Sequence, residues 1–291
     1  MGEVVGAGLL SHVPTIMLPA AERRALNEGR EISLVPGLER LRREVFDVLE
    51  YDGVVVLDSH WATTVEFVIT SHAQRAGLYT SDELPRGMSR IPYDFPGDPE
   101  LARAVASHGA KRGTWITAVD DPYLPMHYAT LNLWRYLGVP EVPWLSMSVG
   151  QTADTEDFLR AGRALGDAIA QLDRDVLLIG SGGMSHMFWP LREIRDHEAS
   201  DPSHVFTAGA RDADLDRIDW LRAGDHGRVL DTMEDFHRFR PEARFGHYLM
   251  MIGAMGEREC TAPGRLYSEY ENAVGTGQVH VWFERPELGW R

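Results

Sequence analysis

Hydrophobic residues lie along the chain in short runs, which alternate with longer stretches where apolar positions recur every three to four residues. The short runs are rich in β-branched residues and are typical of buried strands. They cover Val4–Leu10, Gly53–Asp58, Val65–Thr70, Trp144–Val149 and Asp175–Ser181. The amphipathic stretches predict helices at residues 37–50, 98–112, 154–172 and 241–254, with Asp154 or Thr155 as the cap of the third.

This alternation predicts an α/β fold with a central, mostly parallel or mixed sheet that is flanked by helices. Residues 80–100 are rich in proline, glycine and aspartate, and we expect them to form a surface excursion. The chain has no internal repeat and no long linker-like segment. We therefore expect residues 1–291 to form a single domain.

Composition narrows the classes of function. The net charge of −15 and the pI near 5.2 oppose binding to nucleic acids or to an anionic membrane, so a small molecule is the expected partner. Cys260 is the sole cysteine, which excludes an intramolecular disulfide and a cysteine-rich metal site. Lys111 is the sole lysine and lies in a polar turn, which disfavours P-loop and Schiff-base chemistry.

No stretch of about 18 apolar residues is present, so the sequence does not predict a membrane span. The first ten residues contain an acid and no basic segment, unlike a secretory leader. We expect a cytoplasmic protein.

Three histidines stand where predicted strands end. His12 follows the first strand, His60 ends the second, and His186 closes the glycine-rich segment Ser181-Gly182-Gly183-Met184-Ser185-His186. In α/β sheets, functional groups collect at such ends. Glycines there permit a tight turn or the close approach of a substrate.

Two neutral imidazoles and one carboxylate on one octahedral face bind Fe(II) and leave positions open for substrate and O2. Zn(II) uses similar ligands. The chain has 44 acidic residues, so spacing alone leaves the carboxylate unassigned.

Four segments in a shared order resemble the class III extradiol dioxygenases, the family of the catalytic subunit of protocatechuate 4,5-dioxygenase. They are Ser11-His12-Val13-Pro14, Asp58-Ser59-His60-Trp61, Gly182-Gly183-Met184-Ser185-His186 and Gly275-Thr276-Gly277-Gln278. The segments Gly77–Pro85 and Gly97–Leu101 look closest to the homoprotocatechuate (3,4-dihydroxyphenylacetate) 2,3-dioxygenase lineage. The resemblance covers nearly the whole chain.

The resemblance implies that His12 and His60 bind Fe(II). The carboxylate ligand falls best on Glu242, near the start of the expected apolar helix, with Glu269 and Glu271 as rivals. His186 matches the acid/base histidine of the family, a role that suits a histidine because the free side chain has a pKa of about 6.5.

Two further matches concern the substrate. His127 matches an active-site histidine of the protocatechuate enzymes, whereas the homoprotocatechuate lineage has a different residue there. Asn272 resembles a loop that meets the substrate in protocatechuate enzymes. Asp58 is a candidate acceptor for a ligand imidazole, and the remaining histidines, His247 among them, are expected in surface or core positions.

We therefore expect a single catalytic domain that opens a catechol-type ring beside its hydroxyls, with Fe(II) as cofactor and a muconic semialdehyde-type product. The expected substrate is 3,4-dihydroxyphenylacetate or a related catechol, and gallates and dihydroxypyridines stay open. Arg244 and Arg160 are candidate partners for a substrate carboxylate. The family often assembles, which favours a homo-oligomer. The alternatives are a Zn(II)-dependent hydrolase with the same His/His/carboxylate set and a metal-binding relative without oxygenase activity.

Overall fold

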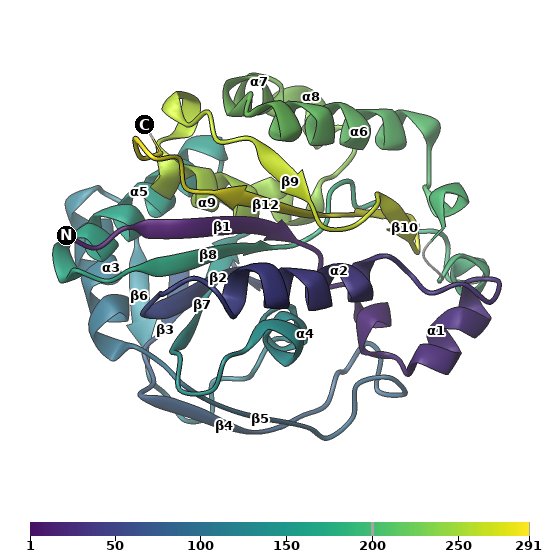
Figure 1. The fold of residues 1–291 in the computed structure, drawn as a ribbon, viewed down its shortest axis with the longest axis horizontal. Helices are drawn as coiled ribbons and strands as arrows, with labels where there is room; N and C mark the ends of the chain where they lie inside the picture. Colours follow the sequence, from purple (N-terminus) through teal and green to yellow (C-terminus); the bar gives the residue numbers. More distant parts are fainter. Residues whose placement is uncertain (199–200, 291) are drawn as a thin grey trace.

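The computed structural model describes residues 1–198 and 201–290. Within them, eight strands form a mixed sheet in the order β6-β3-β7-β2-β8-β1-β12-β9 (Figure 1). Their bounds are β1 Val4–Leu10, β2 Gly53–Thr63, β3 Phe67–Thr70, β6 Ile116–Val119, β7 Trp144–Gly150, β8 Val176–Ser181, β9 Gly264–Leu266 and β12 His280–Glu284. The expected α/β fold with a mixed central sheet is confirmed.

The centre of the sheet is parallel. β7, β2, β8 and β1 run in the same direction, whereas β12 and β9 continue the sheet antiparallel at one side and β3 joins β7 antiparallel at the other. Parallel strands need crossover connections, which place helices on both faces. The ends of β1, β8 and β2 therefore lie side by side at one edge of the sheet.

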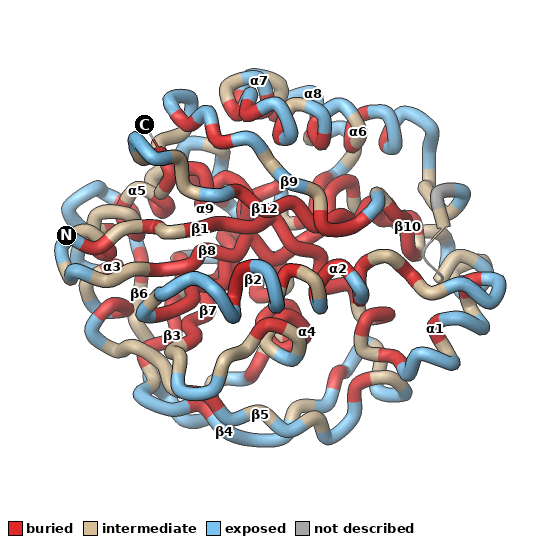
Figure 2. Tube along the Cα trace, viewed as in Figure 1, coloured by how far each residue is buried: buried red, intermediate tan, exposed pale blue. Residues whose placement is uncertain are grey.

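Helices cover both faces of the sheet (Figures 1 and 2), and the backbone of the central strands is buried between them. One face packs against α3, α5 and α9 with α6 to α8 beside them, and the other packs against α2 and α4. The bounds of the helices are α1 Ala20–Leu26, α2 Leu34–Leu41, α3 Pro99–Lys111, α4 Tyr128–Leu137, α5 Thr155–Leu172, α6 Ala208–Ala223, α7 His226–Asp231, α8 Met233–His237 and α9 Gly246–Met255.

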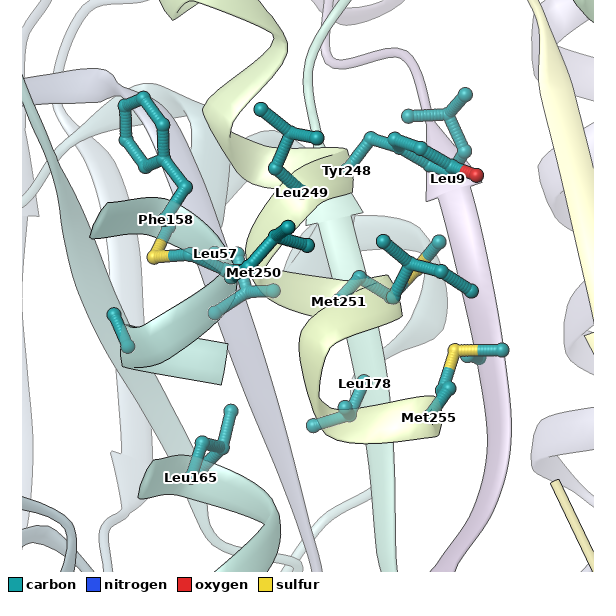
Figure 3. Packing of buried hydrophobic residues seen from close by; sticks show 14 of the residues in the cluster. Leu9, Leu57, Phe158, Leu165, Leu178, Tyr248, Leu249, Met250, Met251 and Met255 are labelled. Carbon is teal, nitrogen blue, oxygen red and sulfur yellow. The ribbon is translucent and has the colours of Figure 1, made fainter. Parts of the chain in front are cut away.

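Helix α9 is buried on nearly all sides, as expected for an element between a sheet and a second helix layer. Figure 3 shows Met250 and Met251 of α9 between α5 and the strands that carry Leu57 and Leu178. Its close contact with α5 depends on Gly162, because a Cβ there would lie 2.1 Å from the carbonyl oxygen of Met250. This packing fixes the position of α9 beneath the edge where β1, β8 and β2 end.

Residues 80–100 belong to an exposed excursion, as expected, but part of it is regular. β4 (Gln74–Tyr79) and β5 (Ile91–Pro96) pair antiparallel as a separate two-stranded sheet. A second such sheet joins β10 (Glu271–Ala273) and β11 (Thr276–Gln278) and brings the Gly-Thr-Gly-Gln segment to the ends of the central strands. None of the helices in the described ranges is long and apolar enough to cross a bilayer.

Candidate metal centre and active site

The three histidines singled out by the sequence come from neighbouring parallel strands. His12 follows β1, and His186 lies just beyond β8. His60 lies inside β2 rather than after it, in an irregularity between Asp58 and Ala62 where the register with β7 shifts. Such a bulge redirects a side chain.

His12 is buried, and its ring orientation is fixed by Ser181. The Nδ1 atom lies 3.0 Å from the Ser181 hydroxyl, which itself donates to the carbonyl of Ala129 at 2.8 Å. Because that hydroxyl proton is already used, Nδ1 is the donor and Nε2 carries the lone pair. Burial lowers the pKa of His12, which favours the neutral form. A neutral imidazole with a free lone pair is the form that binds a metal ion.

Glu242 faces this lone pair, with its Oε1 atom 3.4 Å from Nε2 of His12. Oε1 accepts the Ser59 hydroxyl at 2.5 Å, and Oε2 accepts the amide of Gly183 at 2.6 Å. Burial alone would raise the pKa of Glu242, but the neighbouring imidazoles, His12 first, and the Ser59 hydroxyl lower it well below its usual range. The buried carboxyl is therefore ionised at neutral pH.

The backbone around Glu242 differs from the expected helix at 241–254. Glu242 lies in a short turn, Glu242–Phe245, and α9 begins only at Gly246. Ala243, Arg244 and Phe245 have φ between 47° and 63°, the left-handed region that side chains rarely adopt. This turn separates Glu242 from α9, so the acid lies ahead of the helix, and its carboxylate faces His12.

His60 approaches the same place but contacts another acid. Its Nε2 atom lies 3.1 Å from Oε1 of Glu83, whose Oε2 accepts the Tyr128 hydroxyl at 3.0 Å. The ring centres of His12 and His60 are 6.3 Å apart. Imidazoles that bind one ion at about 2 Å, near a right angle, hold their ring centres roughly 5 Å apart. A small swing of His60 away from Glu83 would bring it into reach of a shared ion.

As they stand, no three His, Cys, Asp or Glu side chains in residues 1–198 and 201–290 are placed to hold a metal ion. His12 and Glu242 already offer one nitrogen and one oxygen donor to the same point, and His60 is the third donor nearby. This donor set fits an octahedral ion bound on one face. The residues therefore fit a metal centre once His60 exchanges its contact with Glu83.

Two cavities meet at these residues. The larger, about 500 Å³, is lined by His12, His60, Glu242 and His186 together, and we call it the chamber. The smaller, about 360 Å³, is lined by His60, Glu242 and His186 but not by His12. Only the chamber therefore reaches all three candidate ligands, and a catechol ring bound to their ion would lie there.

His186 lines the chamber, and its ring has no hydrogen-bond partner among the described residues. The turn before it is held by Asp214, a buried residue of α6, which accepts the amide and the hydroxyl of Ser185 at 2.9 and 2.7 Å. Gly183 does not need positive φ. A Cβ at this position would instead lie 2.9 Å from the Gly277 carbonyl, so glycine is required for close packing.

Several expected site residues lie elsewhere. His127 stacks on Trp61, with ring centres 5.2 Å apart, and lines neither cavity. Asn272 is fully buried, and its neighbours Ala273 and Val274 line the chamber instead.

The other acidic and arginine residues that the sequence suggested for the site do not line the chamber. Asp58 does not orient an imidazole, because its carboxylate accepts the amides of His60 and Trp61 and the hydroxyl of Thr130. The rival acids Glu269 and Glu271 line neither cavity, and Glu271 accepts the amide of Ser33. Arg160 pairs with acids on its own helix, whereas Arg244 lines the smaller cavity.

The structure adds Glu83, Tyr128, Ser59 and Ser181 to the site. Tyr128 lines the chamber and packs against His60, with ring centres 4.0 Å apart. It follows His127 directly, so the sequence pointed to this segment, in which Tyr128 rather than His127 lines the chamber. His247, expected in a core or surface position, is buried beneath Gly182, and burial lowers its pKa to about 4.

The sequence and the fold are similar to those of known proteins. 3,4-Dihydroxyphenylacetate 2,3-dioxygenase of Escherichia coli is 27% identical over 261 residues, which cover 88% of this chain and 91% of the relative. The crystal structure of an uncharacterized protein from Escherichia coli K12 has the same fold, with a TM-score of 0.60 at 15% identity over 96% of this chain and 99% of that one. The profile of the catalytic LigB subunit of aromatic ring-opening dioxygenase matches residues 6–284. The chain therefore belongs to this family and is a ring-opening dioxygenase of the extradiol type.

Proposed function

We propose that this enzyme uses Fe(II), held by His12, His60 and Glu242, to cleave a catechol ring beside its two hydroxyls with both atoms of O2. The observation that carries the proposal is the pairing of His12 Nε2 with the ionised carboxylate of Glu242 at 3.4 Å, at the end of a chamber that His186 also lines. When bound, the ferrous ion would supply a common site for catechol and O2 and pass electron density between them.

The protein's own groups supply binding and proton transfer. Ser181 holds His12 with Nε2 facing Glu242, and Ser59 and Gly183 hold the carboxylate of Glu242. The unpaired imidazole of His186 accepts the phenolic proton of the catechol. It later returns a proton to the substrate as the ring opens. The product is a muconic semialdehyde-type compound.

The substrate we propose is 3,4-dihydroxyphenylacetate or a related substituted catechol. This rests on the name of the Escherichia coli relative and on a chamber of about 500 Å³, which has room for a ring with a side chain. Cytoplasmic location and homo-oligomeric assembly stay predictions from the sequence.

The test is anaerobic reconstitution with Fe(II), followed by O2 uptake across a panel of catechols with product spectra recorded. Ring-cleavage colour with stoichiometric O2 uptake supports the proposal. Activity with Zn(II) but without O2 uptake would instead support a hydrolase with the same ligands.

Two variants separate the proposed roles. His186→Phe should retain iron while turnover falls by roughly two to four orders of magnitude, the usual span for an acid/base group. Glu242→Ala, like His12→Ala and His60→Ala, should lose the iron itself. A Glu242→Ala enzyme with full iron and full activity would end that assignment.

A further inference from the structure

Among the described residues, the acidic and arginine side chains that line the chamber have hydrogen-bond or ion-pair partners, with the exception of Arg195. Glu83 binds His60 and Tyr128, and Glu242 binds Ser59 and the amide of Gly183.

At the other side of the chamber, Arg86 forms ion pairs with Glu22 at 2.9 Å and with Glu198. Arg195 lines the same chamber, and no acidic partner for it occurs within residues 1–198 and 201–290. In a protein with 44 acidic and 29 basic residues, a cation at a cavity wall without a counter-charge indicates a place for an anion from outside.

Arg195 stands on an anchored segment. It lies in a short 3-10 helix, Ile194–His197, whose last residue stacks on Trp189 with ring centres 3.8 Å apart. Val274 fixes this segment to the chamber wall, because it accepts the amide of Trp189 at 3.1 Å and donates its own amide to His197 at 2.6 Å. The backbone that carries Arg195 is thus tied to a residue that itself lines the chamber.

The surroundings of Arg195 indicate which anion fits. Phe188, Leu191 and Ile194 of the same segment line the chamber, and because Phe188 and Leu191 are 52% and 87% exposed, they form an apolar wall at its open side. An aromatic ring would pack against this wall, and the anionic group would have to be carried by its side chain. An inorganic anion would gain nothing from an apolar wall. An aryl carboxylate would pack its ring against the wall and pair its carboxylate with Arg195.

We propose that Arg195 is the specificity-determining residue that binds a carboxylate on the side chain of the catechol substrate. This inference rests on the proposed function and names its substrate class, catechols with an anionic side chain. Bidentate pairing with a carboxylate is the interaction for which a guanidinium is suited.

Arg244 is the rival. It lacks an acidic partner among the described residues, but it lines the smaller cavity, which His12 does not reach. A catechol bound to an ion that His12, His60 and Glu242 hold together would lie in the chamber, which Arg195 also lines.

The experiment compares ligands of the same shape and different charge. Anaerobic Fe(II)-loaded enzyme is titrated with 3,4-dihydroxyphenylacetate and with its uncharged methyl ester, and binding is followed by the absorbance of the bound catecholate. Arg195→Ala should weaken binding of the acid about tenfold, and that of the ester hardly at all. Arg195→Lys should recover part of the loss because it keeps the charge without the planar fork, and Arg195→Glu should favour the cationic catechol dopamine.

Arg192→Ala is the matched control, since Arg192 lies on the same segment, is paired with Glu193 and does not line the chamber. An equal loss for acid and ester in Arg195→Ala, or a selective loss in Arg244→Ala alone, would overturn the inference. Cleavage of uncharged 4-methylcatechol is measured in parallel. If the wild type cleaves no catechol, the proposed function fails, and the binding comparison still decides the role of Arg195.

Discussion

Replacing Asp214 with asparagine should change how the stability of the protein depends on pH. Asp214 is fully buried and accepts the amide and hydroxyl of Ser185 and the hydroxyl of Tyr270, which lies at 2.7 Å. Burial raises its pKa from 3.8 to about 6, although the hydrogen bonds from Tyr270 and Ser185 oppose the rise. The folded protein therefore holds this proton over a pH range in which the unfolded chain has lost it.

The sign and size follow from proton linkage. Between the two pKa values the folded state binds more protons than the unfolded state, so the free energy of unfolding falls as pH rises. For a folded pKa of about 6, the contribution of Asp214 decreases by about 2 kcal/mol between pH 4.5 and 7.5. Asparagine does not titrate, so the Asp214→Asn variant lacks this loss.

Urea unfolding of the metal-free wild type and variant at both pH values measures the effect. The unfolding free energy of the variant minus that of the wild type should increase by about 2 kcal/mol from pH 4.5 to pH 7.5. Asp212→Asn is the control, because Asp212 is an exposed acid on the same helix. A wild-type-to-variant difference that is the same at both pH values would refute the reasoning.

Three further predictions concern the metal site. Burial alone would lower the pKa of His60, but the hydrogen bond with Glu83 raises this pKa above 6.5. A metal ion that binds His60 must therefore displace a proton, and the affinity of the site for the metal should rise with pH. Glu83→Gln should therefore bind Co(II) several-fold more tightly near pH 6.5 in a metal titration, and weaker binding would mean that Glu83 supports the ion. Gly183→Ala should lower stability by about 1 to 3 kcal/mol in calorimetry, because its Cβ would lie 2.9 Å from the Gly277 carbonyl and 3.1 Å from Glu242. Its control Gly227→Ala, with the nearest atom 3.9 Å away, should not be destabilised. Ser181→Ala should lower metal affinity about 10- to 100-fold through the lost partner of His12, and unchanged affinity would show that packing alone orients the ring.

Local sequence patterns predicted the central elements well. β1 has the expected bounds, and Asp154 caps α5 with a reciprocal capping box, because apolar periodicity and capping chemistry are properties of neighbouring residues. The short strands near the C-terminus were missed. β10 and β11 have three residues each, too few to show a period.

The site was predictable only in part. Strand ends located His12 and His60, and the resemblance selected Glu242 among 44 acids. The contact between His60 and Glu83 joins residues 23 positions apart, one in β2 and the other in the loop between β4 and β5, which no spacing rule reveals. Likewise, the choice between His127 and Tyr128 depends on the direction in which α4 begins, a property of tertiary packing.

The left-handed turn at Ala243–Phe245 has a consequence for protein engineering. Each non-glycine residue held in that conformation lowers the free energy of unfolding by about 1 kcal/mol or more. The protein is therefore destabilised by backbone strain next to a candidate iron ligand. Arg244 is exposed, and glycine there would relieve the cost while leaving every donor atom in place. Thermostable versions of this enzyme could therefore be sought at position 244 first, provided that the looser backbone still aims Glu242 at His12.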